Sequence, residues 1–179
     1  KGDNTNLGTI NITSAGGVVN FDNFGPGDTL VGGTVQATGA GNYISQFQAW
    51  HQSNTEGTVT IDTPIAVQND GDSPSYHSSV WLSGSKITIN APITVSEVTP
   101  GAGAGGIGLY GTSALGGNPA FINADLTAGN FLFSTYNGGG ASGSPFDMSV
   151  LLDGDITTTV DGFRSIEFRD VSSVIGPGV

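Results

Sequence analysis

The chain has 179 residues, of which fifteen are acidic and four are basic, and its formal net charge is −11 at pH 7. Such an acidic protein repels phosphate backbones and anionic bilayers, so nucleic acid is excluded as an expected partner. Thirty glycines, 11% charged residues and no cysteine favour short strands over helices and exclude disulfides and thiolate metal sites, so the sequence predicts an all-β protein.

The amino-terminal residues predict an irregular start. Lys1 stands where methionine would open a new chain, which suggests a processed chain or a fragment. The first expected strands, at residues 8–13 and 17–21, form a degenerate coil in which polar Asn6 takes the place of an apolar anchor. No apolar run approaches the length of a transmembrane helix, so we expect no membrane insertion.

From residue 30 onward the same apolar skeleton recurs at intervals of 28 to 33 residues. A period of this length is typical of a solenoid, in which each repeat forms one coil that stacks on its neighbours. The anchor positions of the repeat are Val31, Ile61, Ile89, Ile122 and Leu152.

Within each copy, apolar and polar residues alternate, which predicts a strand with one buried face. In the copy KITINAPITV, residues 86–95, Pro92 falls on the outward side. Proline has no N–H to give a sheet, so its presence predicts a local break in the hydrogen-bond ladder. We expect the coil to bend at the neighbouring inward position, where every copy has a small residue: Gly33, Thr63, Ala91, Ala124 and Gly154.

A second strand is expected after each copy, and polar or glycine-rich insertions of variable length separate the two. This organisation predicts a single domain, residues 1–179, folded as a parallel β-solenoid of about six coils with projecting loops. A jelly-roll β-sandwich is the alternative. The second strands are expected at 43–47, 79–82, 106–110, 131–134 and 165–168, and the insertions at 68–77, 98–105 and 137–145.

The position after the anchor carries polar residues in most copies. Stacking of successive coils would place amides between carboxylates in one column, and such side-chain ladders stabilise stacked parallel strands. The alternative is that asparagine and aspartate occur here only because they favour turns. The column consists of Gly32, Asp62, Asn90, Asn123 and Asp153.

Three segments resemble the repeat region of filamentous haemagglutinin-type exoproteins, the bacterial adhesins exported by two-partner secretion, and of related autotransporter passengers. The segments are INAPITV (89–95), INADLTAGNFLF (122–133) and VLLDGDITTTVDGFRSIEF (150–168), and the resemblance covers residues 28–170. It implies a right-handed parallel β-helix at the cell surface that acts as an adhesin, stalk or fibre. The family's coils are shorter and more regular than these.

Parallel β-helices also include polysaccharide lyases and hydrolases, which use paired carboxylates. Asp153 and Asp155 lie two residues apart on an outward face, and Asp125 is expected one coil away, so the three could form an acid/base group. The alternative is a solvated face with turn-favouring aspartates. Four basic side chains in the whole chain are few for a cleft that holds an acidic polysaccharide, so we expect no enzyme.

Asp70 and Asp72 in the sequence NDGD are the candidate metal ligands. With Asn69 they place hard oxygen atoms around a glycine turn, as calcium requires, although a plain acidic loop is the alternative. No other cofactor is expected. His51 and His77 lie in polar contexts and are expected to be exposed loop residues.

Three remaining patterns have weaker implications. GAGAGG (101–106) matches a nucleotide-binding glycine pattern, but no basic residue or helix follows it. Trp81 and Tyr110 are expected to pack at the core or the sheet edge, with glycan binding as the alternative. Thr94, Thr127 and Thr157 form an outward column similar to those of ice-binding solenoids, but the column is short.

Neither terminal sequence resembles a capping helix, so the end coils are expected to meet other copies or adjoining repeats. We therefore expect a non-catalytic structural or adhesive element of an extracellular or cell-surface fibre, with glycans as possible further partners. The alternatives are a carbohydrate-active β-helix enzyme and a strand-exchanging, calcium-linked fibre subunit.

Overall fold

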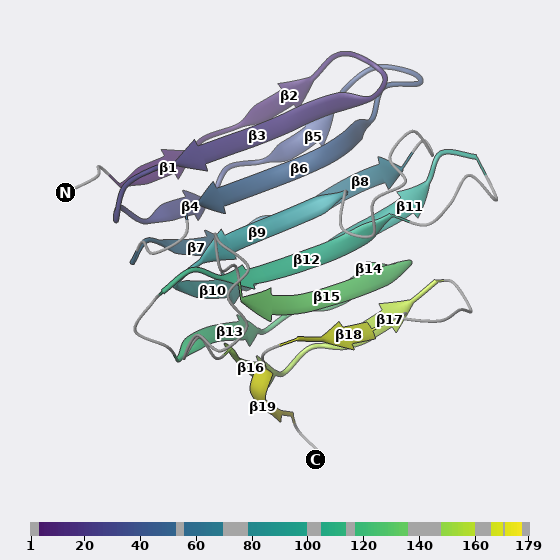
Figure 1. Ribbon diagram of the computed structural model, residues 1–179. Coiled ribbons are helices and arrows are strands. Elements are labelled where there is room, and N and C mark those ends of the chain that lie inside the picture. Colours follow the sequence, from purple (N-terminus) through teal and green to yellow (C-terminus); the bar gives the residue numbers. More distant parts are fainter. Residues whose placement is uncertain are drawn as a thin grey trace.

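The computed structural model describes residues 4–52, 56–69, 79–99, 105–113, 117–135, 148–159, 166–169 and 171–176. Within these ranges the chain has strands and no helix, and every strand pairing is parallel. The strands recur in sets of three and wind into a β-solenoid of about five turns, with the two ends of the chain at opposite ends of the stack (Figure 1). The predicted solenoid is confirmed, and the jelly roll, whose strands pair antiparallel, is excluded.

The solenoid has three faces. The first sheet contains, in spatial order, β1 (Thr5–Leu7), β4 (Thr29–Val31), β7 (Thr58–Ile61), β10 (Lys86–Ile89), β13 (Asn118–Ile122), β16 (Met148–Leu152) and β19 (Val171–Ile175). The second face contains the pair β2 (Ile10–Ile12) and β5 (Val35–Ala37), and the sheet of β8 (Ile65–Asn69), β11 (Ile93–Glu97), β14 (Leu126–Ala128) and β17 (Ile156–Thr158). The third sheet contains β3 (Gly17–Asn23), β6 (Ile44–His51), β9 (Val80–Gly84), β12 (Gly106–Gly111), β15 (Asn130–Thr135) and β18 (Ile166–Phe168).

The repeat anchors stack in register along the first sheet. Each of the five expected anchors pairs with the next across neighbouring strands, from Val31 to Leu152. The anchor of the first coil was wrongly assigned to Asn6, because Leu7 is the residue that pairs with Val31. Asn6 pairs with Leu30 on the outer face, since neighbouring residues of a strand point to opposite sides.

Each predicted inner strand is two strands separated by a three-residue corner, and this corner explains Pro92. β10 ends at Ile89 and β11 begins at Ile93. The backbone N–H of Asn90 still donates to the preceding coil, and the ladder resumes when the N–H of Ile93 donates to the next coil. Pro92 lies between these two positions, and its carbonyl accepts a hydrogen bond from Ile65 (3.0 Å), so the missing N–H leaves no gap.

The corner also explains the column of small residues. A Cβ added to Gly33 would collide with the backbone of Gly8, and one added to Gly154 would collide with the backbone of Ala124. The coils therefore approach each other closely here, and the predicted bend is confirmed at these positions.

The core is a continuous apolar column inside the coils. In the middle coils the inward residues of all three faces are buried, and the bulkiest of the buried side chains are aromatic or branched. At the carboxyl-terminal end the Phe133 ring stacks on the Phe168 ring, with centroids 4.8 Å apart. Stacked inward side chains of this kind make each coil part of the packing surface for the next.

Candidate functional site

The polar column on the first sheet forms a side-chain hydrogen-bond ladder. The Asn90 amide donates from Nδ2 to Asp62 Oδ1, and the Asn123 amide donates from Nδ2 to Asn90 Oδ1, both at 2.7 Å. The predicted ladder is thus confirmed for three members, and it has a direction. Every amide donates toward the amino-terminal end, which leaves the Asn123 oxygen as the last group of the run.

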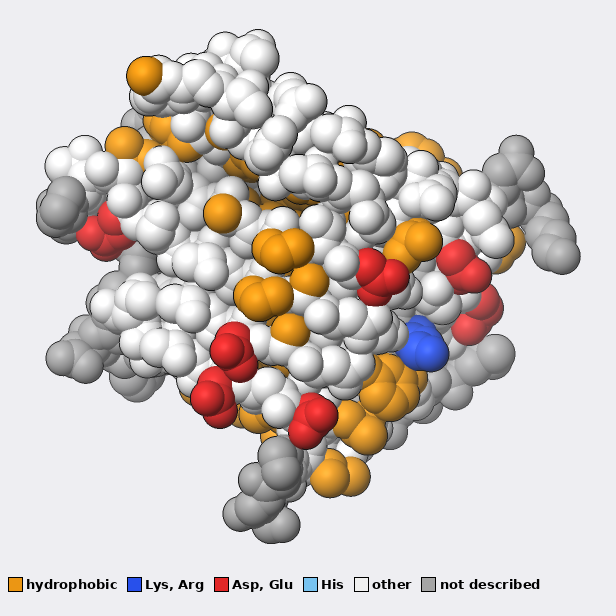
Figure 2. Space-filling view, turned by 180° about the vertical axis from the view of Figure 1, so that it is seen from behind, with side chains coloured by type: hydrophobic (Ala, Val, Ile, Leu, Met, Phe, Trp, Pro, Cys, Tyr) orange, Lys and Arg blue, Asp and Glu red, His pale blue; other side chains and the backbone are white. Residues whose placement is uncertain are grey.

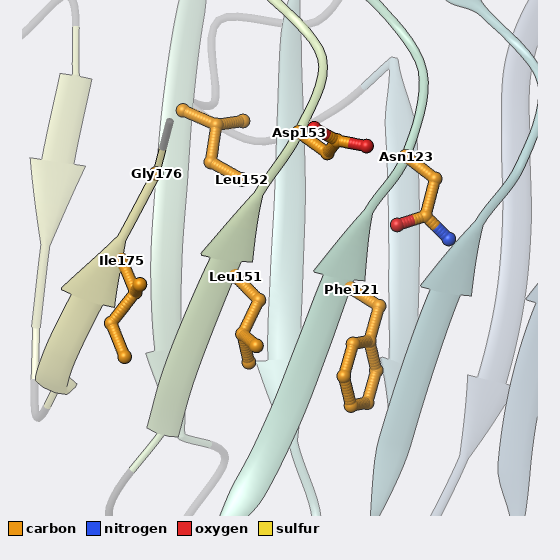
Figure 3. A pocket seen from close by; sticks show the side chains of 7 residues that line it. All are labelled: Phe121, Asn123, Leu151, Leu152, Asp153, Ile175 and Gly176. Carbon is orange, nitrogen blue, oxygen red and sulfur yellow. The ribbon is translucent and has the colours of Figure 1, made fainter. Parts of the chain in front are cut away.

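Asp153 follows Asn123 in this column and adds a second acceptor. The two residues end up beside each other because their strands, β13 and β16, pair in register. Figure 3 shows the Asn123 oxygen on the side of Asp153 and the Asp153 carboxylate extending toward Asn123. Both side chains are exposed, and no hydrogen bond from another described residue reaches the Asp153 carboxylate. Two exposed acceptors therefore lie next to each other at this end of the column.

An apolar groove adjoins this acceptor pair. Its volume is about 390 Å³, and its floor is formed by Phe121, Leu151 and Ile175, which lie in one row across β13, β16 and β19. Figure 3 shows the three side chains next to one another, with Asn123 and Asp153 above them at the strand ends. Leu152 and Gly176 complete the lining.

The groove was not predicted from the sequence, although the repeat contains its signal. The position before each anchor faces outward, and in the middle coils it holds Thr60 and Thr88. In the last coils the same row becomes Phe121, Leu151 and Ile175. A change from threonine to large apolar residues at an outward position marks an exposed patch, and 59% of Ile175 is accessible to solvent.

A basic side chain borders the groove on the side away from β19. The Lys86 ammonium lies 5.2 Å from the centroid of the Phe121 ring, a cation–π contact. Figure 2 shows this face of the molecule, where apolar side chains gather low on the solenoid beside a basic one, with acidic side chains around them.

The three candidate catalytic aspartates occupy corners. Asp125 and Asp155 take the same corner position in successive coils, and the backbone N–H of Asp155 donates to Asp125 Oδ1 at 3.0 Å. Both carbonyls also accept ladder hydrogen bonds, from Ile93 and Leu126 respectively. All three aspartates are exposed, and within the described ranges no lysine or arginine pairs with them. The arrangement matches the turn role that was the alternative to an acid/base group.

His51 is buried, so the expectation of an exposed loop histidine was wrong. It is the last residue of β6, where the inward series Phe47, Ala49 and His51 continues the strand alternation. Nε2 lies 3.1 Å from the Thr29 hydroxyl and Nδ1 lies 3.4 Å from the Gly25 carbonyl. Burial lowers the pKa of the imidazole, against smaller opposing effects that include the Asp28 carboxylate. These contacts indicate a structural histidine.

Trp81 and Tyr110 stack with ring centroids 4.7 Å apart on the outer side of the third sheet. Tyr110 is only 7% exposed, and burial raises the pKa of its phenol to about 12, although Arg169 works slightly against this. The predicted packing role is confirmed for Tyr110. The threonine column is also present, because Thr94, Thr127 and Thr157 pair in register on the second face.

Several candidate residues lie outside the described residues. These are Asp70 and Asp72 of the proposed calcium loop, His77, and most of the glycine segment 101–106. Asn69 is described and is buried at the end of β8. In the part of the chain that the structure describes, no three His, Asp or Glu side chains are grouped to hold a metal ion.

Comparisons with known proteins do not assign the chain to a family. None of the described segments forms a helix that could cross a membrane. No family model, no curated protein and no solved structure matches the chain.

Proposed function

We propose that the chain is a non-catalytic structural or adhesive element of an extracellular bacterial fibre or surface exoprotein, in which coils stack end to end. The observation that carries the proposal is the exposed core of the last coil. Ile166 and Phe168 pair with Phe131 and Phe133, which are each 1% exposed, yet they are themselves 42% and 44% exposed. Inward apolar side chains of this kind are stabilised when a further coil covers them.

The open strand edges support the same proposal. β17 and β18 are edge strands of their sheets, and β1 and β3 are edge strands at the other end. Unpaired backbone groups on such edges are templates for another strand of the same orientation. Because all pairings are parallel, a second copy can add its first coil to the last coil of its neighbour without a change of direction, and this heterologous contact propagates into a filament.

The resemblance to filamentous haemagglutinin-type repeats supports an extracellular bacterial setting. In such an exoprotein the covering coil would come from an adjoining repeat, and in a free subunit it would come from another copy. Both arrangements use the same surface, and neither requires a cofactor or a catalytic group.

Sedimentation velocity over a range of protein concentrations tests end-to-end stacking. Ile166→Lys places a charge in the exposed core of the last coil, where a stacked neighbour would bury it, and should weaken association by about tenfold or more. Val98→Lys is the matched control, because Val98 is 41% exposed and follows β11 in the middle of the stack. Equal sedimentation of wild type and both variants as monomers would refute end-to-end stacking between copies of this chain.

A further inference from the structure

We propose that the groove formed by Phe121, Leu151 and Ile175 binds a basic peptide segment of a partner protein. An apolar side chain of the peptide lies on the groove floor, and a lysine or arginine lies between Asn123 and Asp153. The groove is on the outer face of the first sheet, so this binding is separate from stacking at the ends of the solenoid.

Asn123 and Asp153 present two acceptors to a ligand on this face. Asn123 donates an N–H of its amide to Asn90 and turns its oxygen toward Asp153 (Figure 3), and a carboxylate is an acceptor without a proton to give. A cationic donor satisfies both groups at once, and hydrogen bonds between an ionised donor and a carboxylate are about twice as strong as neutral ones.

The apolar floor of the groove favours a ligand that also carries an apolar side chain. Phe121 and Leu151 are half-buried and Ile175 is largely exposed, so a ligand gains free energy by covering them with hydrocarbon. A simple polyamine would leave the apolar floor of the groove exposed to water, and a neutral sugar would not pair with the charge of Asp153. A peptide segment that contains both apolar and basic residues can supply the hydrocarbon and the cation together, because the long stem of an arginine or lysine lets its charge reach past the apolar floor.

The surrounding charges favour a basic ligand whose cation lies at the Asp153 end of the groove. The chain has a net charge of −11, and Asp125 and Asp155 are exposed at the same corner of the solenoid as Asp153. These carboxylates attract a cation to this end of the groove. Lys86 already lies against the Phe121 ring at the opposite side, and it repels a second cation from there.

Fluorescence anisotropy with a fluorescein-labelled peptide of sequence LRLRL tests the proposal. The controls are LQLQL, which keeps the apolar residues without charge, and LELEL, which reverses the charge. We expect Asp153→Asn to weaken binding of LRLRL by about fivefold or more, because it removes the charge and keeps the shape. Asp22→Asn removes the same charge from exposed β3 on the third sheet and should change binding by less than about twofold.

A second variant tests the apolar floor. Leu151→Thr gives this row the residue that it already has at Thr60 and Thr88, so the strand should tolerate it and the fold should persist. We again expect a loss of about fivefold or more. If either variant fails to fold, nitroxide-labelled LRLRL should still broaden the NMR signals of Leu151 and Ile175 in the wild-type chain.

Three outcomes would overturn the proposal. Equal weakening by Asp22→Asn would show that net charge alone attracts the peptide, and equal binding of LQLQL would show that no cation is recognised. Displacement of the peptide by maltoheptaose would assign the groove to a sugar. The titrations are repeated in the Ile166→Lys background, where failure of peptide binding is separable from failure of stacking.

Discussion

At the scale of single residues, His51 makes the fold sensitive to acid. Burial lowers its pKa in the folded chain below the ordinary value of 6.5, so the unfolded chain binds more protons in the interval between the two pKa values. The free energy of unfolding therefore has its full value above pH 6.5 and falls as the pH drops from 6.5 toward the lowered pKa.

Urea unfolding at pH 7.5 and at pH 5.5 measures this effect. The wild-type chain should lose stability between the two conditions, and His51→Gln should lose less, because glutamine keeps a polar group near Thr29 but does not titrate. The same loss in both proteins would contradict the assignment of this pH dependence to His51.

The residue scale also shows where the sequence was informative and where it was not. The alternation of inward and outward residues through Phe47 and Ala49 extends to His51 and predicts that its side chain is buried. The polar context of His51 predicts an exposed side chain instead, and that prediction is wrong. Asn6 was misassigned because one residue of register reverses the face of a strand, and the short β1 offers few residues to fix it. The groove was missed because it depends on how one outward position changes between coils, from Thr60 and Thr88 to Leu151, whereas the repeat was recognised by the inward residues that stay the same.

At the scale of elements, the ladder on the first sheet stabilises neighbouring coils. Asn90→Asp would remove the donor to Asp62 and place two carboxylates side by side, so it should lower the free energy of unfolding by about 1 kcal/mol at low salt, and less at high salt. Asn20→Asp is the control, because Asn20 is exposed on β3 and its substitution adds the same charge away from the ladder. Urea unfolding at two salt concentrations compares the variants, and equal effects would contradict a specific role for the ladder.

The elements were largely predictable because stacking repeats the same chemistry in every coil. The anchors, the small residues of the corner and the column from Asp62 to Asn123 each recur at one place in the repeat, so five weak copies reinforce one prediction. The division of each inner strand at the corner was less predictable, because alternation continues through the bend and hides the strand ends. Pro92 was the local sign of that division.

At the scale of the whole molecule, the two ends differ. Leu7 and Val19 in the first coil are 9% and 5% exposed, whereas Ile166 and Phe168 in the last coil are 42% and 44% exposed. The period predicted the solenoid, but only the assembled coils reveal this uncovered end and the groove next to it. An uncovered core at one end and open strand edges at both ends suit head-to-tail assembly.

Negative-stain electron microscopy of the purified chain, with calcium and with a chelator, tests end-to-end stacking most directly. Stacked coils predict unbranched filaments of uniform width in both conditions, because the contact is made by backbone edges and apolar side chains. Filaments that require calcium would favour a metal-linked assembly, such as one through Asp70 and Asp72. Dispersed particles at every concentration tested would contradict self-association through the ends.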